Sequence, residues 1–92
     1  MKLFDHIERI NRLHELIRHR RTGAPGELAE RLGLSPSMVF KLMDELKLKG
    51  APIEYSRQLK TYYYARQYMM NIKMEFRLLN EDEVERYRGG SL

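Results

Sequence analysis

Polar and cationic side chains that suit phosphate oxygens and nucleobase edges recur at helical spacing after position 34. Ser37 and Lys41 are four residues apart, about one helical turn, and Ser35 stands where such a helix would begin. Hydroxyl groups and the free N–H groups of a helix N-terminus donate to phosphate oxygens, and a lysine ammonium reaches a phosphate or a guanine edge. The chemistry available here is hydrogen bonding to an anionic ligand, without a covalent step.

Further side chains extend this candidate surface. Met38 and Phe40 lie at the two margins of the helix face, where an apolar group either contacts a thymine methyl or completes the core. Asp44 shares the face and repels phosphate unless it accepts a hydrogen bond from a cytosine amine. Ser35 is equally a good helix cap, and Lys41 is equally a solvated charge. A second polar cluster, between two strand-like runs, consists of Arg57, Gln58 and Lys60.

Catalysis finds no support in the residue pattern. His6, His14 and His19 share no helical face with carboxylates at metal-ligand spacing, and we expect them to be ordinary surface or margin residues. The chain has no cysteine, no serine–histidine–aspartate pattern and no glycine-rich phosphate loop. The sequence therefore predicts a protein that is not an enzyme, with no cofactor, no metal and no evident small-molecule effector site.

A first helix is expected over 3–21, because apolar residues recur there at helical spacing. They are Leu3, Ile7, Ile10, Leu13 or His14, and Ile17. The basic end of this helix suits the negative pole of the helix dipole, and it could also reach a nucleic-acid backbone. The possible backbone contacts are Arg20, Arg21 and Thr22.

Two shorter helices are expected to meet at a tight turn. The first begins at Pro25 and is broken by Gly33, which readily adopts a positive φ. The second spans 36–49, with Ser35 as its N-cap and Pro36 at its first position. Its inward apolar stripe consists of Val39, Leu42, Met43 and Leu46.

A β-hairpin follows. The runs 53–56 and 61–64 alternate as strands around the link at 57–60. The side chains expected to face the helices are Ile53, Tyr55, Tyr62 and Tyr64, which leaves Glu54 and Tyr63 outside.

An additional strand is expected within 66–79, because the apolar period changes to two. This strand either covers the core or pairs with its copy in a second subunit. The proposed dimerisation residues on its apolar face are Met70, Ile72, Met74 and Phe76.

The tail at 80–92 is expected to be a short helix or a flexible segment, with Asn80 as the cap and Glu83 at the capping-box position. The pattern Leu79, Glu83-Val84, Tyr87 and Gly89-Gly90 also resembles the end of a double-glycine leader peptide, which a peptidase cleaves after the second glycine. Cleavage there would release two residues, so we take this as the weaker interpretation.

Composition limits the class of protein. Ninety-two residues suit one small domain, here 1–65, with two additions at 66–79 and 80–92. The net charge is +4, and because the tail carries −2, the remainder carries +6, which favours a polyanionic partner. No apolar run approaches the roughly 20 residues of a membrane span, so we expect a cytoplasmic protein that does not enter membranes.

The segment from Leu28 to Ser35, the apolar stripe of the following helix and the Gly50–Tyr55 turn and strand closely resemble a known family. They are similar to the winged helix-turn-helix domains of DeoR-type, WYL-type and biotin-repressor-type bacterial transcription regulators. The resemblance implies an α+β, mainly α fold with three helices and a β-hairpin wing. It also implies that helix 36–49 enters the major groove and that the wing at 56–61 contacts the flanking backbone. The residues that would face DNA are then Ser35, Ser37, Met38, Phe40, Lys41, Arg57, Gln58 and Lys60.

The sequence thus favours a sequence-specific, homodimeric binder of double-stranded DNA. A second class remains open, namely an adaptor that has lost DNA binding and pairs with a protein through the 68–78 strand. Charge reversal at Lys41, Arg57 and Lys60 separates the two.

Overall fold

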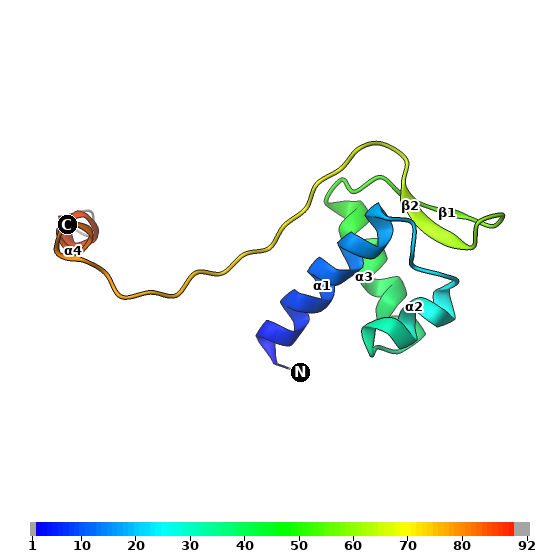
Figure 1. Ribbon diagram of the computed structural model, residues 1–92, viewed down its shortest axis with the longest axis horizontal. Helices are drawn as coiled ribbons and strands as arrows, with labels where there is room; N and C mark the ends of the chain where they lie inside the picture. The colour runs from blue at the N-terminus through cyan, green and yellow to red at the C-terminus, as the bar shows by residue number, and fades with distance from the viewer. Residues whose placement is uncertain (1, 90–92) are drawn as a thin grey trace.

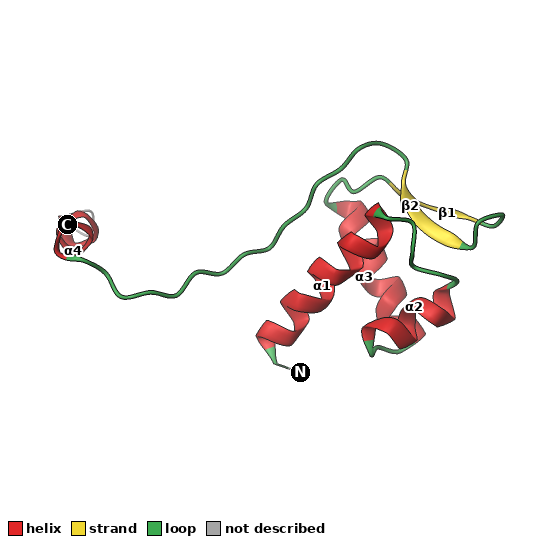
Figure 2. Ribbon diagram, viewed as in Figure 1, coloured by secondary structure: helices red, strands yellow, loops and turns green. Residues whose placement is uncertain are grey.

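The computed structural model describes residues 2–89, and this part of the chain holds four helices and one two-stranded antiparallel hairpin (Figures 1 and 2). In chain order these are α1 (Leu3–Arg18), α2 (Pro25–Leu32), α3 (Pro36–Leu48), β1 (Ile53–Ser56), β2 (Thr61–Tyr64) and α4 (Glu81–Gly89). The architecture is α+β, mainly helical, and compatible with a winged helix. Among the helices of residues 2–89, none has both the length and the apolar character needed to cross a bilayer.

The turn between α2 and α3 has the predicted geometry. Gly33 ends α2 in the left-handed conformation, with φ 66° and ψ 35°, which glycine adopts without a steric cost. Ser35 Oγ accepts a hydrogen bond from the Met38 N–H at 3.3 Å, and Pro36 occupies the first turn of α3. The start of α3 is therefore fixed by its own sequence.

The core lies where the first three helices meet the hairpin. α1 packs against α2 and β2, and α2 packs against α3. The predicted inward stripe of α3 is buried, and both alternatives on α1, Leu13 and His14, are buried too. The buried apolar residues are Leu13, Ile17, Leu28, Ala29, Leu32, Val39, Leu42, Met43, Leu46, Ala51, Ile53 and Tyr62.

The hairpin has the predicted strands and the predicted inner face. Its register pairs Ile53 with Tyr64 and Tyr55 with Tyr62, so these four side chains point to one side. Ile53 and Tyr62 are buried, and the other two pack half-buried against the core. The aromatic rings of the hairpin therefore belong to the body of the protein.

A pair of threonines joins the hairpin to the connection between α1 and α2. Thr22 is fully buried, and its Oγ1 accepts a hydrogen bond from the Tyr62 N–H at 2.8 Å. The Thr22 N–H donates to Thr61 Oγ1 at 3.2 Å, and the two hydroxyls are 3.1 Å apart. These bonds fix the hairpin relative to α2, because buried backbone groups of this kind are costly to leave unpaired.

The first helix is shorter than predicted, ending at Arg18 rather than at 21. Arg20 adopts the left-handed conformation with φ 57°. Its N–H bonds to the Ile17 carbonyl at 3.0 Å, and the Arg21 N–H bonds to the Leu16 carbonyl at 2.8 Å. This is a Schellman-type end formed without glycine, and composition alone did not reveal it.

The additional strand predicted within 66–79 is wrong, because this segment contains no strand. Residues 66–80, here called the arm, leave the end of β2 and run away from the body to α4 (Figure 1). Tyr68 and Met70 pack against the core, so the proximal arm does cover it. A strand needs a backbone partner along its length, and β1 and β2 pair only with each other in the two-stranded sheet.

One side chain of α1 pairs with the backbone of a single arm residue, as a neighbouring strand would do. The Asn11 amide donates to the Ile72 carbonyl at 2.8 Å, and its oxygen accepts from the Ile72 N–H at 3.0 Å. Farther along, the rings of Phe4 and Phe76 meet edge to face at 5.7 Å. The arm is thus held along α1 at separate points.

The predicted tail helix is present as α4, beginning one residue after Asn80. The Glu83 N–H donates to Asn80 Oδ1 at 2.9 Å, and the Asn80 N–H donates to Glu83 Oε1 at 3.1 Å, so the capping box is confirmed. Arg77 pairs with both Glu75 and Glu83. The second glycine of the leader-like pattern lies outside the described residues.

Candidate functional site

The candidate surface on α3 is the side of this helix that faces away from the core. Ser35, Ser37 and Lys41 are all exposed, while Val39 and Leu42 between and beyond them are buried. The hydroxyl oxygens of the two serines are 3.1 Å apart, at the N-terminal end of the helix. This end therefore combines hydroxyl donors with the positive pole of the helix dipole, an arrangement suited to anions.

The margins of this face differ from each other. Phe40 is 49% exposed, a large apolar ring with nearly half of its area in water, whereas Met38 is half-buried. Asp44 is exposed one turn beyond the predicted contacts and places one negative charge on the helix. The face therefore offers one cation, two hydroxyls and one accessible aromatic ring.

The hairpin link forms a second exposed cluster. Arg57, Gln58 and Lys60 are all exposed. Ser56 Oγ accepts a hydrogen bond from the Leu59 N–H at 3.1 Å, and Lys60 adopts φ 51°, so the link is a tight turn. Its tip points away from the side on which the arm leaves the body (Figure 1). The turn therefore places two cations, Arg57 and Lys60, at the tip of the hairpin.

The three possible backbone contacts after α1 have different environments. Arg20 and Arg21 are exposed, and the Arg20 guanidinium lies 5.2 Å from the centre of the Tyr63 ring. Arg31 donates a hydrogen bond to the Arg21 carbonyl, which leaves the Arg21 side chain outside this contact. Thr22 is fully buried and its hydroxyl is bonded within the protein, so this prediction is corrected: Thr22 is not available to a ligand.

His14 is buried, whereas the residue pattern predicted a position at the surface or its margin. It is 2% exposed, and its Nδ1 lies 2.6 Å from the Tyr64 hydroxyl. Its Nε2 lies 3.4 Å from the Met70 nitrogen, whose N–H can only donate. The neutral ring therefore carries its hydrogen on Nδ1 and donates it to Tyr64. In the sequence, the only indication of this burial was that His14 stands beside Leu13 on the apolar side of the expected helix.

Burial sets the protonation states of this cluster. Desolvation lowers the pKa of His14 from its ordinary value, with Arg18 acting in the same direction and Glu15 opposing. Burial, together with Tyr68 and Glu15, raises the pKa of Tyr64 to about 12. Both side chains are thus neutral near pH 7, as the hydrogen bond to the arm requires.

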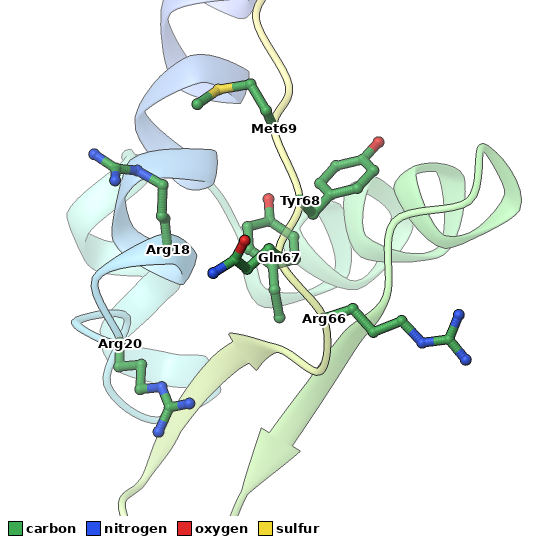
Figure 3. Close-up of a pocket in the computed structure, with 7 residues that line it drawn as sticks. Arg18, Arg20, Arg66, Gln67, Tyr68 and Met69 are labelled. Carbon is green, nitrogen blue, oxygen red and sulfur yellow. The ribbon is translucent and has the colours of Figure 1, made fainter.

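A hollow of about 550 Å³ lies between the end of α1, the end of β2 and the base of the arm (Figure 3). Arg18 at the end of α1 and Arg20 in the turn that follows lie on one side of the arm, and Arg66 extends on the other side (Figure 3). Tyr64, Gln67 and Tyr68 also line it, and none of the described residues that do so is acidic. The residues that line this hollow are spread along the chain from 18 to 69, so the sequence alone did not bring them together.

Within residues 2–89, no three histidine or acidic side chains come close enough together to hold a metal ion. No protein-family model, no curated protein and no solved structure matches the chain.

Proposed function

We propose that the protein is a small bacterial transcription regulator that binds double-stranded DNA. In this proposal α3 is a recognition helix of a winged helix-turn-helix domain and enters the major groove, and the hairpin is the wing that contacts the flanking backbone. The protein would act in the cytoplasm as a homodimer.

The observation that carries this proposal is the division of α3 into a buried stripe and an exposed donor face. The buried stripe anchors the helix, while Ser37 and Lys41 remain free of the core. The N-terminus of α3 is fixed by the Gly33 turn and the Ser35 cap. A rigid helix with donors at its N-terminal half is the element that major-groove recognition uses.

The charge distribution supports a polyanionic partner. Residues 1–79 carry the +6 excess, and the exposed cations of the hairpin tip, Arg57 and Lys60, belong to this part. Phosphate contacts of this kind supply affinity and orientation, whereas the α3 side chains would supply base discrimination. With one lysine and one aspartate on the α3 face, a single domain is expected to bind modestly.

A homodimer would raise this affinity by engaging two half-sites. Of the proposed dimerisation residues, Met70 and Ile72 are half-buried on their own body, while Met74 and Phe76 are 44% and 72% exposed. Leu78, which continues the same pattern of every second residue, is 95% exposed. The distal arm, rather than the whole predicted strand, is therefore the proposed contact between subunits.

Selection of bound duplexes from a random pool tests the proposal, followed by fluorescence anisotropy on the selected site. The double variant Lys41→Glu/Arg57→Glu is expected to lose at least about tenfold in affinity and to show a smaller salt slope. The control Lys73→Glu/Arg86→Glu makes the same change in net charge at exposed positions of the arm and α4. An equal loss in both variants would show that only overall charge matters and would contradict the assigned face.

The exposed distal arm also favours a second candidate, an adaptor that binds another protein without binding DNA. Under that function no duplex is enriched from the pool, and Lys41→Glu/Arg57→Glu leaves partner binding intact. Under the first function the same variant weakens binding to the selected duplex at least about tenfold. Comparison of the wild type with this double variant therefore distinguishes the two candidate functions.

A further inference from the structure

We propose that the hollow at the base of the arm binds a small phosphorylated ligand with a planar ring, of the nucleotide class. The inference goes beyond the proposed function, since it concerns a different surface and holds whether or not α3 binds DNA. Among the residues that line the hollow, only Arg20 is also a candidate contact to DNA.

The lining of the hollow is rich in arginine. Arg18, Arg20 and Arg66 all line the hollow, and no acidic side chain among the described residues does. Arg18 and Arg20 lie on one side of the arm, and the guanidinium group of Arg66 extends to the other side, so it would have to turn toward the hollow to reach a ligand (Figure 3). Glu15 pairs with Arg18 at 3.0 Å from outside the lining and compensates one of these charges. Two positive charges are left to attract a dianion, and guanidinium groups bind phosphate in a bidentate manner.

Two tyrosine rings contribute an aromatic wall to the hollow. Tyr64 and Tyr68 both line the hollow, with ring centres 5.1 Å apart and planes inclined by 45°. Tyr64 is held in place by His14 at 2.6 Å. Fixed tyrosine rings beside cations suit a ligand that has both an aromatic base and a phosphate, because stacking and ion pairing then act together.

The size and the position of the hollow also suit a small molecule. A volume of about 550 Å³ lies within the range of roughly 300–1,000 Å³ that small-molecule sites occupy. The lining comes from the end of α1 and the turn after it, from Tyr64 at the end of β2, and from the arm at Arg66–Met69, so a bound ligand would connect the body to the arm. Binding is therefore expected to hold the base of the arm on the body.

Isothermal titration of the full chain with ADP, adenosine and pyrophosphate tests both halves of the ligand. ADP is expected to bind at least about tenfold more tightly than either fragment, since only ADP has both ring and phosphate. Absence of ADP binding at millimolar concentration, or pyrophosphate binding as tightly as ADP, would overturn the proposal.

Matched variants locate the site. Arg18→Gln/Arg66→Gln is expected to weaken ADP binding at least about tenfold, while Lys47→Gln/Arg86→Gln, which removes two exposed charges elsewhere, leaves it unchanged. Equal weakening in both would indicate charge attraction without a site and overturn the proposal. Hydrogen exchange on the unmodified chain gives a second readout: ADP is expected to slow exchange at 66–72, and unchanged exchange there would contradict the bridging role.

Discussion

His14 connects the core to the arm through both of its ring nitrogens. In its neutral form Nδ1 donates to Tyr64 and Nε2 accepts from the Met70 N–H. A second proton would occupy Nε2, which would then face another donor. Protonation is therefore incompatible with the observed contact to the arm, in addition to the cost of charging a buried ring.

The stability of the protein is expected to fall as the solution becomes mildly acidic. Because burial lowers the pKa of His14, the unfolded chain binds a proton at higher pH than the folded chain does. Stability from this residue is thus present above the ordinary histidine pKa of about 6.5 and is lost as the pH falls below it. Thermal unfolding measured between about pH 7.5 and about pH 5 checks this direction.

The control for this pH dependence is His14→Gln, which keeps a polar group but does not titrate. Its unfolding midpoint is expected to be lower than that of the wild type at about pH 7.5 and to vary less on acidification. If His14→Gln kept the full pH dependence, another group would be responsible.

Single residues were predictable where their role depends on neighbours in sequence. The Gly33 turn, the Ser35 cap and the Asn80–Glu83 box follow from local chemistry, and all are present. Thr22 and His14 were not predictable, because their partners are about 40 to 56 residues away and become neighbours only after folding. The same separation hid the hollow at the base of the arm.

At the scale of elements, the arm shows why alternation of apolar residues does not suffice to define a strand. Helices α2 and α3 satisfy their own backbone hydrogen bonds, so their patterns predicted them well. A strand depends on a partner that its own sequence does not specify. In the arm only Ile72 has both backbone groups paired by a side chain, that of Asn11.

Replacing Asn11 by alanine is expected to release the arm without unfolding the body. Both hydrogen bonds to Ile72 are lost, while the apolar core that contains Leu13 and Ile17 keeps its packing. Amide exchange at Ile72 should then accelerate by about tenfold or more, since each bond contributes roughly 0.5–1.5 kcal/mol. Exchange followed by NMR measures this, and Arg12→Ala, an exposed neighbour on α1, should leave Ile72 protected.

An unchanged exchange rate at Ile72 in Asn11→Ala would mean that packing of Tyr68 and Met70 alone holds the arm. A large fall in the unfolding midpoint would mean that arm and body form one cooperative unit. The two measurements together thus show which contacts define the element.

On the scale of the whole molecule, the distal arm carries several of the exposed apolar side chains of residues 2–89, while others, such as Phe40, Leu48 and Leu59, lie on α3 and the hairpin link. The arm beyond Ile72 presents Met74, Phe76 and Leu78 on one alternation, next to Phe4 at the start of α1. The longest extent of the chain is 56 Å, nearly three times its shortest extent of 20 Å. Helix α4 lies at the far end of the arm (Figure 1). Grouped apolar side chains of this kind mark association surfaces more often than scattered ones do.

The distal arm is therefore expected to mediate a symmetric dimer. In sedimentation equilibrium the wild type should have twice the chain mass of 11.1 kDa. The variant Met74→Ser/Phe76→Ser/Leu78→Ser should have the mass of a single chain, because the apolar area buried between subunits is lost. Lys73→Ser/Glu75→Ser alters the alternate positions with no change in net charge and should remain dimeric. A wild type that stays monomeric at about 100 µM, or a triple variant that stays dimeric, would contradict the assignment of this surface.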